Sequence, residues 1–112
     1  MQGQKEMLDK FESVNQTNKE GNPAGGYAKG IGIDIRWQDG PLGQGENRKE
    51  PNGASVETVI AIAIDRIKFY NESKFKCHEN SVAITKLEEA LMWLDYRTKN
   101  REQQGVEGTY KA

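Results

Sequence analysis

Two segments in the second half of the chain carry apolar residues at helical spacing. In residues 55–73, apolar side chains recur every three or four positions, which places them on one face of a helix. The second segment, residues 79–104, repeats the pattern, and neither segment contains Gly or Pro. We therefore predict two amphipathic helices. Their apolar positions are Val56, Val59, Ile60, Ala63, Ile64, Ile67 and Tyr70 in the first, and Ala83, Ile84, Leu87, Ala90, Leu91 and Leu94 in the second.

The link between the two segments, residues 73–80, is short, so the helices are expected to pack antiparallel as a helical hairpin. Ser55 is a good N-cap for the first helix, and Glu57 in its first turn suits the positive end of the helix dipole. Gly105 is placed to end the second helix in the left-handed conformation.

A period of two replaces the helical period upstream of the hairpin. Over residues 30–38, three isoleucines and Trp37 alternate with Gly or polar residues, which predicts one half-buried strand that Tyr27 extends at its start. Residues 39–53 follow with four glycines and two prolines, which predicts a loop. Loops of this length in small domains often carry function.

The first 26 residues are polar and rich in Gln, Asn, Lys, Glu and Gly. They form either a frayed arm or a short docked helix with Met7, Leu8, Phe11 and Val14 on one side. Pro23 and the glycines after it would end such a helix. We therefore divide the chain into a flexible arm, residues 1–26, and one α+β domain, residues 27–112. Within that domain, residues 27–54 hold the strand and loop, 55–104 the hairpin and 105–112 a tail.

Composition bounds the size of the core. The chain has 112 residues, of which 35% are hydrophobic and 29% charged, so a single small domain with a marginal core is expected. Two helices alone cannot cover both of their apolar stripes. We therefore predict a homo-oligomer in which hairpins pack against hairpins.

Charge, hydropathy and cysteine content argue against nucleic-acid binding, a membrane span and secretion. A net charge of −1 gives no electrostatic support for binding a DNA or RNA polymer. The chain has no apolar run of about 18 residues, so no membrane span is expected, and its polar start predicts no secretory signal. The single cysteine, Cys77, excludes an internal disulfide and favours a reducing compartment.

Catalysis finds little support in the residues. The one histidine, His78, adjoins Cys77, and sequence neighbours in a helix or turn do not face each other as a catalytic pair. No further Cys or His completes a zinc site, and we expect no cofactor. Glu88 and Glu89 are typical of a solvated helix face. The segment GPLGQG matches neither a dinucleotide-binding nor a P-loop fingerprint, so we predict a protein that is not an enzyme.

Binding of a small ligand is better supported. Trp37 ends a strand beside the Gly-rich loop, and Tyr70 lies near the end of the first helix, so either ring is placed to stack on a base. Arg97 lies at the edge of the second apolar stripe, where a guanidinium can contact phosphate oxygens. Asn80, at the start of that helix, caps the helix or contacts a ligand. The alternative assigns Trp37 and Tyr70 to the core, and Arg97 and Arg101 to the helix dipole.

Asn80 and Arg97 are 17 positions apart, which is about 26 Å along a helix. One protomer therefore cannot easily bring both residues, with Tyr70, to one small molecule. A pocket that uses all three has to be shared between protomers, so ligand binding is tied to oligomerisation.

The segment IDIRWQDGPLG and the stretch from residue 52 to the VEGT near the C-terminus resemble the phage Thoeris anti-defense protein 1 family. The resemblance spans about residues 30–109, and its two ends, WQDGPLG and VEGT, are its more specific parts. Gln104 stands before Gly105, where the family usually has Arg. Members of this family are small phage proteins that bind and sequester a glyco-cyclic ADP-ribose signal made by bacterial Thoeris immunity.

The resemblance implies a fold, an assembly and a location. It implies an α+β fold in which a small N-terminal antiparallel β-sheet precedes a long antiparallel helical hairpin. It implies assembly into dimers and then a hexamer, with cyclic nucleotide signals as partners. It also implies action in the cytoplasm of the infected bacterial host.

The resemblance also implies a signal pocket between protomers, built from an aromatic residue, an Asn and an Arg of the hairpin. The matching positions are Tyr70, or its neighbour Phe69, with Asn80 and Arg97. Some relatives hold CBASS cyclic di- or trinucleotides at separate Arg-lined sites, for which the candidates are Arg36 and Arg48. The motif residues added to the ligand-binding set are Trp37, Gln38, Asp39 and Thr109. The alternative function is a structural or adaptor hairpin oligomer without a ligand.

Overall fold

The computed structural model of the protein describes residues 10–112, in which a three-stranded sheet precedes two helices. The chain divides into two compact units. One takes in the described residues up to Ala54 together with Gly108–Ala112, and the other is Ser55–Glu107. The sheet and the helical hairpin confirm the predicted α+β class. The elements are β1 (Phe11–Thr17), β2 (Pro23–Gly30), β3 (Ile33–Arg36), the 3₁₀ helix η1 (Gly45–Asn47), α2 (Val56–Asn71) and α3 (His78–Gln103).

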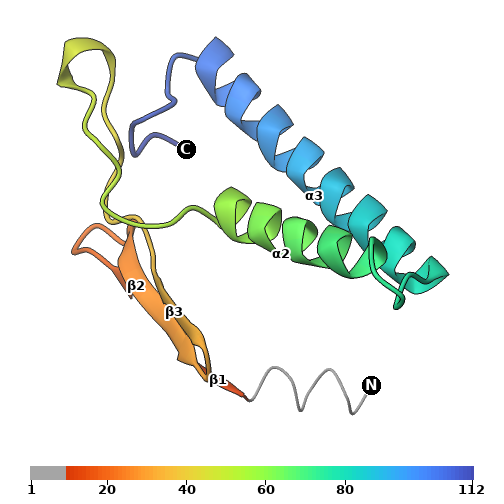
Figure 1. Ribbon diagram of the computed structural model, residues 1–112. Helices are drawn as coiled ribbons and strands as arrows, with labels where there is room; N and C mark the ends of the chain where they lie inside the picture. The colour runs from red at the N-terminus through yellow and green to blue at the C-terminus, as the bar shows by residue number, and fades with distance from the viewer. Residues whose placement is uncertain (1–9) are drawn as a thin grey trace. The chain divides into compact units, whose positions relative to one another are not determined.

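The three strands form an antiparallel sheet in the order β1-β2-β3 (Figure 1). The side chain of Asn18 orders the first turn by accepting the N–H groups of Glu20 and Asn22, each at 3.0 Å. At the second turn Gly30 pairs with Ile33, so Ile31 and Gly32 form a two-residue connection. Gly32 has φ +74°, a conformation that glycine adopts without steric cost.

The structure overturns the prediction for residues 11–26, because strands take the place of a frayed arm or a docked helix. β1 has only two apolar residues, Phe11 and Val14, and the register places them on opposite faces of the sheet. Backbone pairing with the glycine-rich β2 therefore forms this strand without an apolar stripe. At Gly26, a Cβ would lie 2.0 Å from the carbonyl oxygen of Val14, so glycine is required for the close pairing. Met7 and Leu8 lie outside the described residues.

The single strand predicted over residues 30–38 is also wrong. The chain turns at Ile31 and Gly32, and Ile31 is fully exposed. Gly30 and Ile33 face each other on the same side of the sheet, so the inward-facing positions change from even to odd numbers across the turn. The sequence hides this change because the exposed turn residue Ile31 is apolar and lies two positions before Ile33, as a strand residue would.

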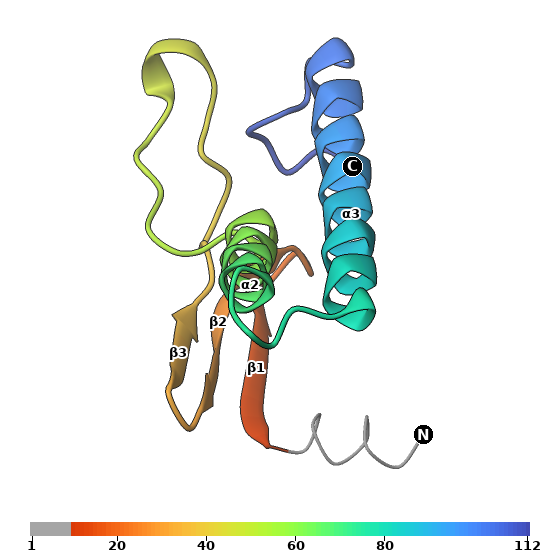
Figure 2. The ribbon, with the colours of Figure 1, turned by 45° about the vertical axis from the view of Figure 1, so that its right-hand side comes forward.

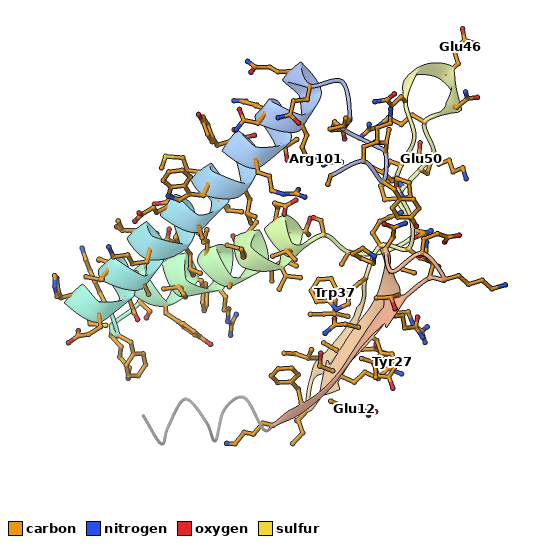
Figure 3. All side chains as sticks on the ribbon, turned by 180° about the vertical axis from the view of Figure 1, so that it is seen from behind. Glu12, Tyr27, Trp37, Glu46, Glu50 and Arg101 are labelled. Atoms are coloured by element: carbon orange, nitrogen blue, oxygen red, sulfur yellow. The ribbon has the colours of Figure 1, made fainter. Side chains whose placement is uncertain are left out.

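The pairing register gives the sheet one apolar and one polar face. Phe11, Gly30 and Ile33 share the apolar face, and Glu12, Lys29 and Asp34 share the other. On the polar face the hydroxyl of Tyr27 donates to Glu12 Oε1 at 3.0 Å (Figure 3). This hydrogen bond and the negative charge of Glu12 raise the pKa of Tyr27 above its ordinary value.

Residues 39–53 form a loop, as predicted, and hydrogen bonds close both its base and its tip. At the base, the N–H of Gln38 donates to Ala54 O at 3.0 Å, and the N–H of Ala54 donates to Arg36 O at 2.7 Å. Near the tip, the N–H of Gly43 donates to Gly108 O at 2.9 Å, so the C-terminal tail belongs to the same unit as the loop.

Both predicted ends of the helical hairpin are confirmed. Ser55 caps α2, and its Oγ accepts the N–H of Thr58 at 3.2 Å. After α3, Gly105 has φ +72°. Its N–H donates to Glu102 O, and the next N–H, of Val106, donates to Arg101 O, each at 3.0 Å. This pair of hydrogen bonds is the Schellman arrangement that ends a helix at glycine.

The two helices run antiparallel and lie side by side near their link (Figures 1 and 2). Asn71 orders the link, because it donates to Ser81 Oγ and accepts the N–H of Cys77, both at 3.1 Å. Lys68 and Glu88 form an ion pair between the helices at 3.6 Å. None of the helices within residues 10–112 combines the length and the apolar character that a membrane crossing requires.

The core of the isolated chain is very small. Ile64, 7% exposed, is the only buried hydrophobic side chain in residues 10–112, and the other predicted seam positions are half-buried or exposed. Many large apolar side chains in this part of the chain face solvent: Phe11, Ile31, Ile33, Val56, Ile62, Phe69, Tyr70, Phe75, Val82, Met92, Trp93, Tyr96 and Tyr110.

Candidate functional site

The aromatic part of the candidate site lies at the end of α2. Phe69 and Tyr70 are 57% and 42% exposed, and their ring centroids lie 6.0 Å apart. The guanidinium carbon of Arg66 lies 4.8 Å from each ring centroid. Arg66 was not among the residues predicted from the sequence. The spacing of three and four positions from Arg66 to the two rings is a signal that could have identified it.

Asn80 lies in the first turn of α3 and is half-buried. Its Nδ2 donates to the carbonyl oxygen of Phe75 at 3.4 Å, so the side chain contacts the link between the helices. The N-cap of α3 is Cys77, which makes no side-chain capping bond. Asn80 therefore does not cap its helix. At 3.4 Å, the bond to Phe75 is long for a hydrogen bond.

Arg97 is far from these residues within one hairpin. α3 is an unbroken helix over His78–Gln103, so Asn80 and Arg97 are separated by 17 positions, or about 26 Å. The side chain of Arg97 is exposed, and no carboxylate within residues 10–112 forms an ion pair with it. The nearby Asp95 pairs instead with Lys99 at 3.0 Å. A single hairpin therefore presents the aromatic group at the end of α2, near the link, and the guanidinium toward the other end of α3.

Gln38 and Asp39 hold the base of the loop. Asn52 donates its N–H to Gln38 Oε1 at 2.9 Å, and its Oδ1 accepts the N–H of Asp39 at 2.8 Å. Trp37 is half-buried and lies on the face of the sheet opposite Tyr27 (Figure 3). The polar atoms of Gln38 thus have a structural use in the isolated chain, and the carboxylate of Asp39 is exposed.

The remaining candidates lie in the same unit. Arg36 is exposed on β3 and pairs with Tyr27 across the sheet. Arg48 Nη1 donates to Gly43 O at 3.3 Å, and Thr109 Oγ1 accepts the N–H of Lys111 at 3.2 Å. Because Gly43 is hydrogen-bonded to Gly108, the structure brings Arg48 close to the segment that carries Thr109.

Two further observations concern a hollow on the sheet and groups that could hold a metal ion. A hollow of about 500 Å³ lies over Gly30 on the apolar face of the sheet, lined by Lys10, Phe11, Ile31 and Ile33, and none of the predicted ligand residues borders it. In the part of the chain from residue 10 onward, no group of three or more His, Cys, Asp or Glu residues is arranged to hold a metal ion.

Residues 29–99, well over half of the chain, match the model of the family described as the Acb2/Tad1 hairpin domain. The chain belongs to this family. A relative named Thoeris anti-defense 1, from the Bacillus phage SBSphiJ7, is 57% identical over 77 residues, which are 69% of this chain and 51% of the relative. The chain thus spans about half the length of that relative. The family resemblance inferred from the sequence is confirmed.

The region matched by the Acb2/Tad1 hairpin model starts at the end of β2 and continues to Lys99 in α3. It contains every predicted ligand residue except Thr109. Strand β1 and the C-terminal tail lie outside it. The candidate site is therefore carried almost entirely by the part of the chain that defines the family.

Proposed function

We propose that this protein is a phage anti-defense protein that binds and sequesters a glyco-cyclic ADP-ribose immune signal without degrading it. Membership of the Acb2/Tad1 hairpin family and the name of the phage relative support this role. In this account the protein acts in the cytoplasm of the infected bacterium, where the signal is made, and prevents the signal from reaching its effector.

The observation that carries the proposal is the separation between the aromatic group and Arg97. Tyr70 and Asn80 lie near the link of the hairpin, and Arg97 lies toward the other end of α3. A second hairpin that runs in the opposite direction brings its Arg97 to the Tyr70 of the first. We therefore propose that two protomers complete each pocket, in a dimer that assembles further into a hexamer.

The exposed surface of the isolated chain supports this assembly. One buried hydrophobic side chain within residues 10–112 is a very small core, and small domains often gain stability by association. Exposed side chains such as Val82 and Ile62 lie on the helices that would meet. Burial of apolar area between protomers stabilises by about 25 cal/mol per Å².

The free energies expected for single contacts favour an enclosed pocket. Stacking on one aromatic ring contributes about 1–3 kcal/mol per base, and a hydrogen bond to a charged group about 1.5–3 kcal/mol. A dissociation constant of about 1 nM corresponds to about 12 kcal/mol. Tyr70 and Arg97 together therefore supply about 2.5–6 kcal/mol, at most half of that free energy. Enclosure between two protomers supplies the water-excluded surroundings that strengthen these contacts and add others.

The arrangement of the paired carboxylates Glu88 and Glu89 is consistent with a protein that binds its ligand without catalysing a reaction. Glu88 and Glu89 lie on exposed helix surface and form ion pairs with Lys68 and Lys86, at 3.6 and 3.8 Å. Paired, solvated carboxylates of this kind are poorly placed to act as a general acid and base on one ligand. We therefore propose a binding protein without catalytic residues or a cofactor.

We further propose that Arg36 and Arg48 contribute to separate sites for CBASS cyclic di- or trinucleotides. Both side chains are exposed, on β3 and in the loop after η1. Guanidinium groups are suited to such ligands because they bind phosphate oxygens in a bidentate manner.

A thermal-shift titration tests the proposed function. The purified protein is titrated with glyco-cyclic ADP-ribose and, in parallel, with cyclic di- and trinucleotides. A ligand that binds only the native state raises the melting temperature in proportion to the logarithm of its excess over Kd. We expect a large shift with the ADP-ribose signal and recovery of intact signal after heat denaturation. Degraded signal would show an enzyme instead.

The second candidate function is a structural or adaptor protein, and the far side of α3 favours it. Met92, Trp93 and Tyr96 are each about 60% exposed, and Trp93 contacts Tyr96 edge-on at 6.1 Å between centroids. Exposed aromatic groups of this kind are enriched in protein interfaces. Absence of a thermal shift with every nucleotide would favour this function.

A further inference from the structure

Arg66 lies one helical turn before Phe69 and Tyr70 on the exposed side of α2. Its guanidinium carbon is 4.8 Å from both ring centroids, so two aromatic rings flank one cation. Residues three and four positions apart are neighbours on a helix surface, which accounts for this contact. All three side chains are exposed, and a ligand can therefore reach the rings and the guanidinium together.

The guanidinium of Arg66 is not paired with a carboxylate in the described part of the chain, and the neighbouring Lys68 pairs with Glu88. The planar guanidinium therefore keeps its N–H donors for an anion. The contact of the guanidinium with the two rings explains the position of the side chain but gives its N–H groups no oxygen acceptor within residues 10–112.

We propose that Arg66, Phe69 and Tyr70 form one nucleotide-binding platform, in which a ring stacks on the base and Arg66 binds a phosphate oxygen of the same ligand. The inference rests on the proposed function and identifies a ligand residue in addition to those predicted. It also removes the choice between Phe69 and Tyr70, since both rings flank the same guanidinium. A ligand phosphate that reaches Arg66 lies beside both rings.

In this arrangement, the two guanidinium groups that contact phosphate, those of Arg66 and Arg97, come from different protomers. Arg66 lies on the same helix as the rings, and Arg97 comes from the second hairpin in the proposed assembly. A ligand with a pyrophosphate, or with two phosphodiesters, then meets a guanidinium from each side. This arrangement favours nucleotides with at least two phosphates over a nucleoside or a nucleoside monophosphate.

Calorimetric titration of Arg66→Met tests the inference, because methionine keeps a long apolar side chain beside the rings and removes the charge. We expect Kd for glyco-cyclic ADP-ribose to rise about 10- to 100-fold, the loss of a charge-assisted contact. The melting temperature of the free protein should stay unchanged. Arg66→Lys, which keeps the charge and loses the planar fork, should show a smaller rise in Kd. Lys68→Met, on another side of α2, is the matched control and should bind as the wild type does.

The outcomes separate the inference from the proposed function. Wild-type affinity in both Arg66 variants, with a wild-type protein that binds the signal, would overturn the platform and leave the function intact. Absence of binding in the wild type would overturn both. A lower melting temperature in Arg66→Met together with normal affinity in Arg66→Lys would assign Arg66 to stability alone and overturn the platform.

Discussion

The N–H of Gly43 donates to the carbonyl oxygen of Gly108 at 2.9 Å, which joins the loop after the sheet to the C-terminal tail. A Cβ at Gly108 would lie 2.3 Å from Gly43 O, so the two backbones approach as closely as glycine permits. Arg48 adds a donor to the same carbonyl oxygen at 3.3 Å. The two segments that carry the more specific family motifs therefore meet in space.

Replacement of Gly108 by alanine should weaken this contact. Gly108 has φ +79°, which costs a residue with a Cβ about 1–2 kcal/mol, and the clash with Gly43 adds to this cost. Gly32→Ala is the matched control, because Gly32 has φ +74° and nothing within 4 Å of its Cβ position. Urea unfolding should show a larger loss of free energy of unfolding for Gly108→Ala. Equal losses in the two variants would contradict a role for the contact.

Ile64 should account for much of the stability of the hairpin. Truncation of a buried isoleucine to alanine costs about 2–5 kcal/mol, and Ile64 is the only hydrophobic side chain buried within residues 10–112. Ile31→Ala removes the same atoms from a fully exposed side chain and should change the free energy of unfolding by less than about 0.5 kcal/mol. Urea unfolding of both variants measures the difference. Similar effects would mean that Ile64 is not part of a core.

Ionisation of Tyr27 should lower the stability of the protein at alkaline pH. The hydrogen bond to Glu12 raises the folded-state pKa of Tyr27 above its ordinary value of 10.0. The bond therefore stabilises the protein fully below about pH 10, and its contribution is lost as the pH rises through the raised pKa. Phenolate absorbance should show one tyrosine that titrates late, and Tyr27→Phe should remove it. Loss of a tyrosine that titrates normally would contradict the assignment.

Arg97→Ala should abolish tight binding without changing assembly. Loss of a charge-assisted contact to phosphate is expected to raise Kd for the signal about 10- to 100-fold, and the exposed side chain makes no ion pair within residues 10–112. Lys99→Ala, one turn or less away on α3, removes a cation that pairs with Asp95 and should leave Kd unchanged. Calorimetry gives the affinities, and analytical ultracentrifugation gives the mass. Equal affinities for the two variants would exclude Arg97 from the site.

Local signals made the hairpin predictable. Ser55 and Gly105 act on backbone groups within a few residues of themselves, and the apolar stripes repeat with the helical period. Strand β1 gave no such signal, because its pairing depends on the distant Gly26 and its apolar residues are few. The turn at Ile31 was missed because Ile31 is an apolar turn residue at the spacing expected of a strand residue, which conceals the change of face at the turn.

Within the candidate site, the sequence predicted only the distances between residues on the same helix. Helical rise is fixed, so the distance between Asn80 and Arg97 follows from the sequence alone. The use of Gln38 to hold Asn52 was not predictable, because loop residues that meet in space carry no periodic pattern. The spacing of three and four positions allows Arg66 to contact both rings. The contact itself was recognised only from the side-chain geometry.

Mixing two defective chains tests whether two protomers complete each pocket. Tyr70→Ala and Arg97→Ala are each expected to bind the signal poorly when expressed alone. In a mixed dimer, the intact Tyr70 of one chain meets the intact Arg97 of the other, so one pocket has both residues and the second pocket has neither. Calorimetric titration of the co-expressed variants should therefore show a fraction of sites with wild-type affinity. If the mixture contains only weak sites, each pocket takes both residues from one chain, and the account is wrong.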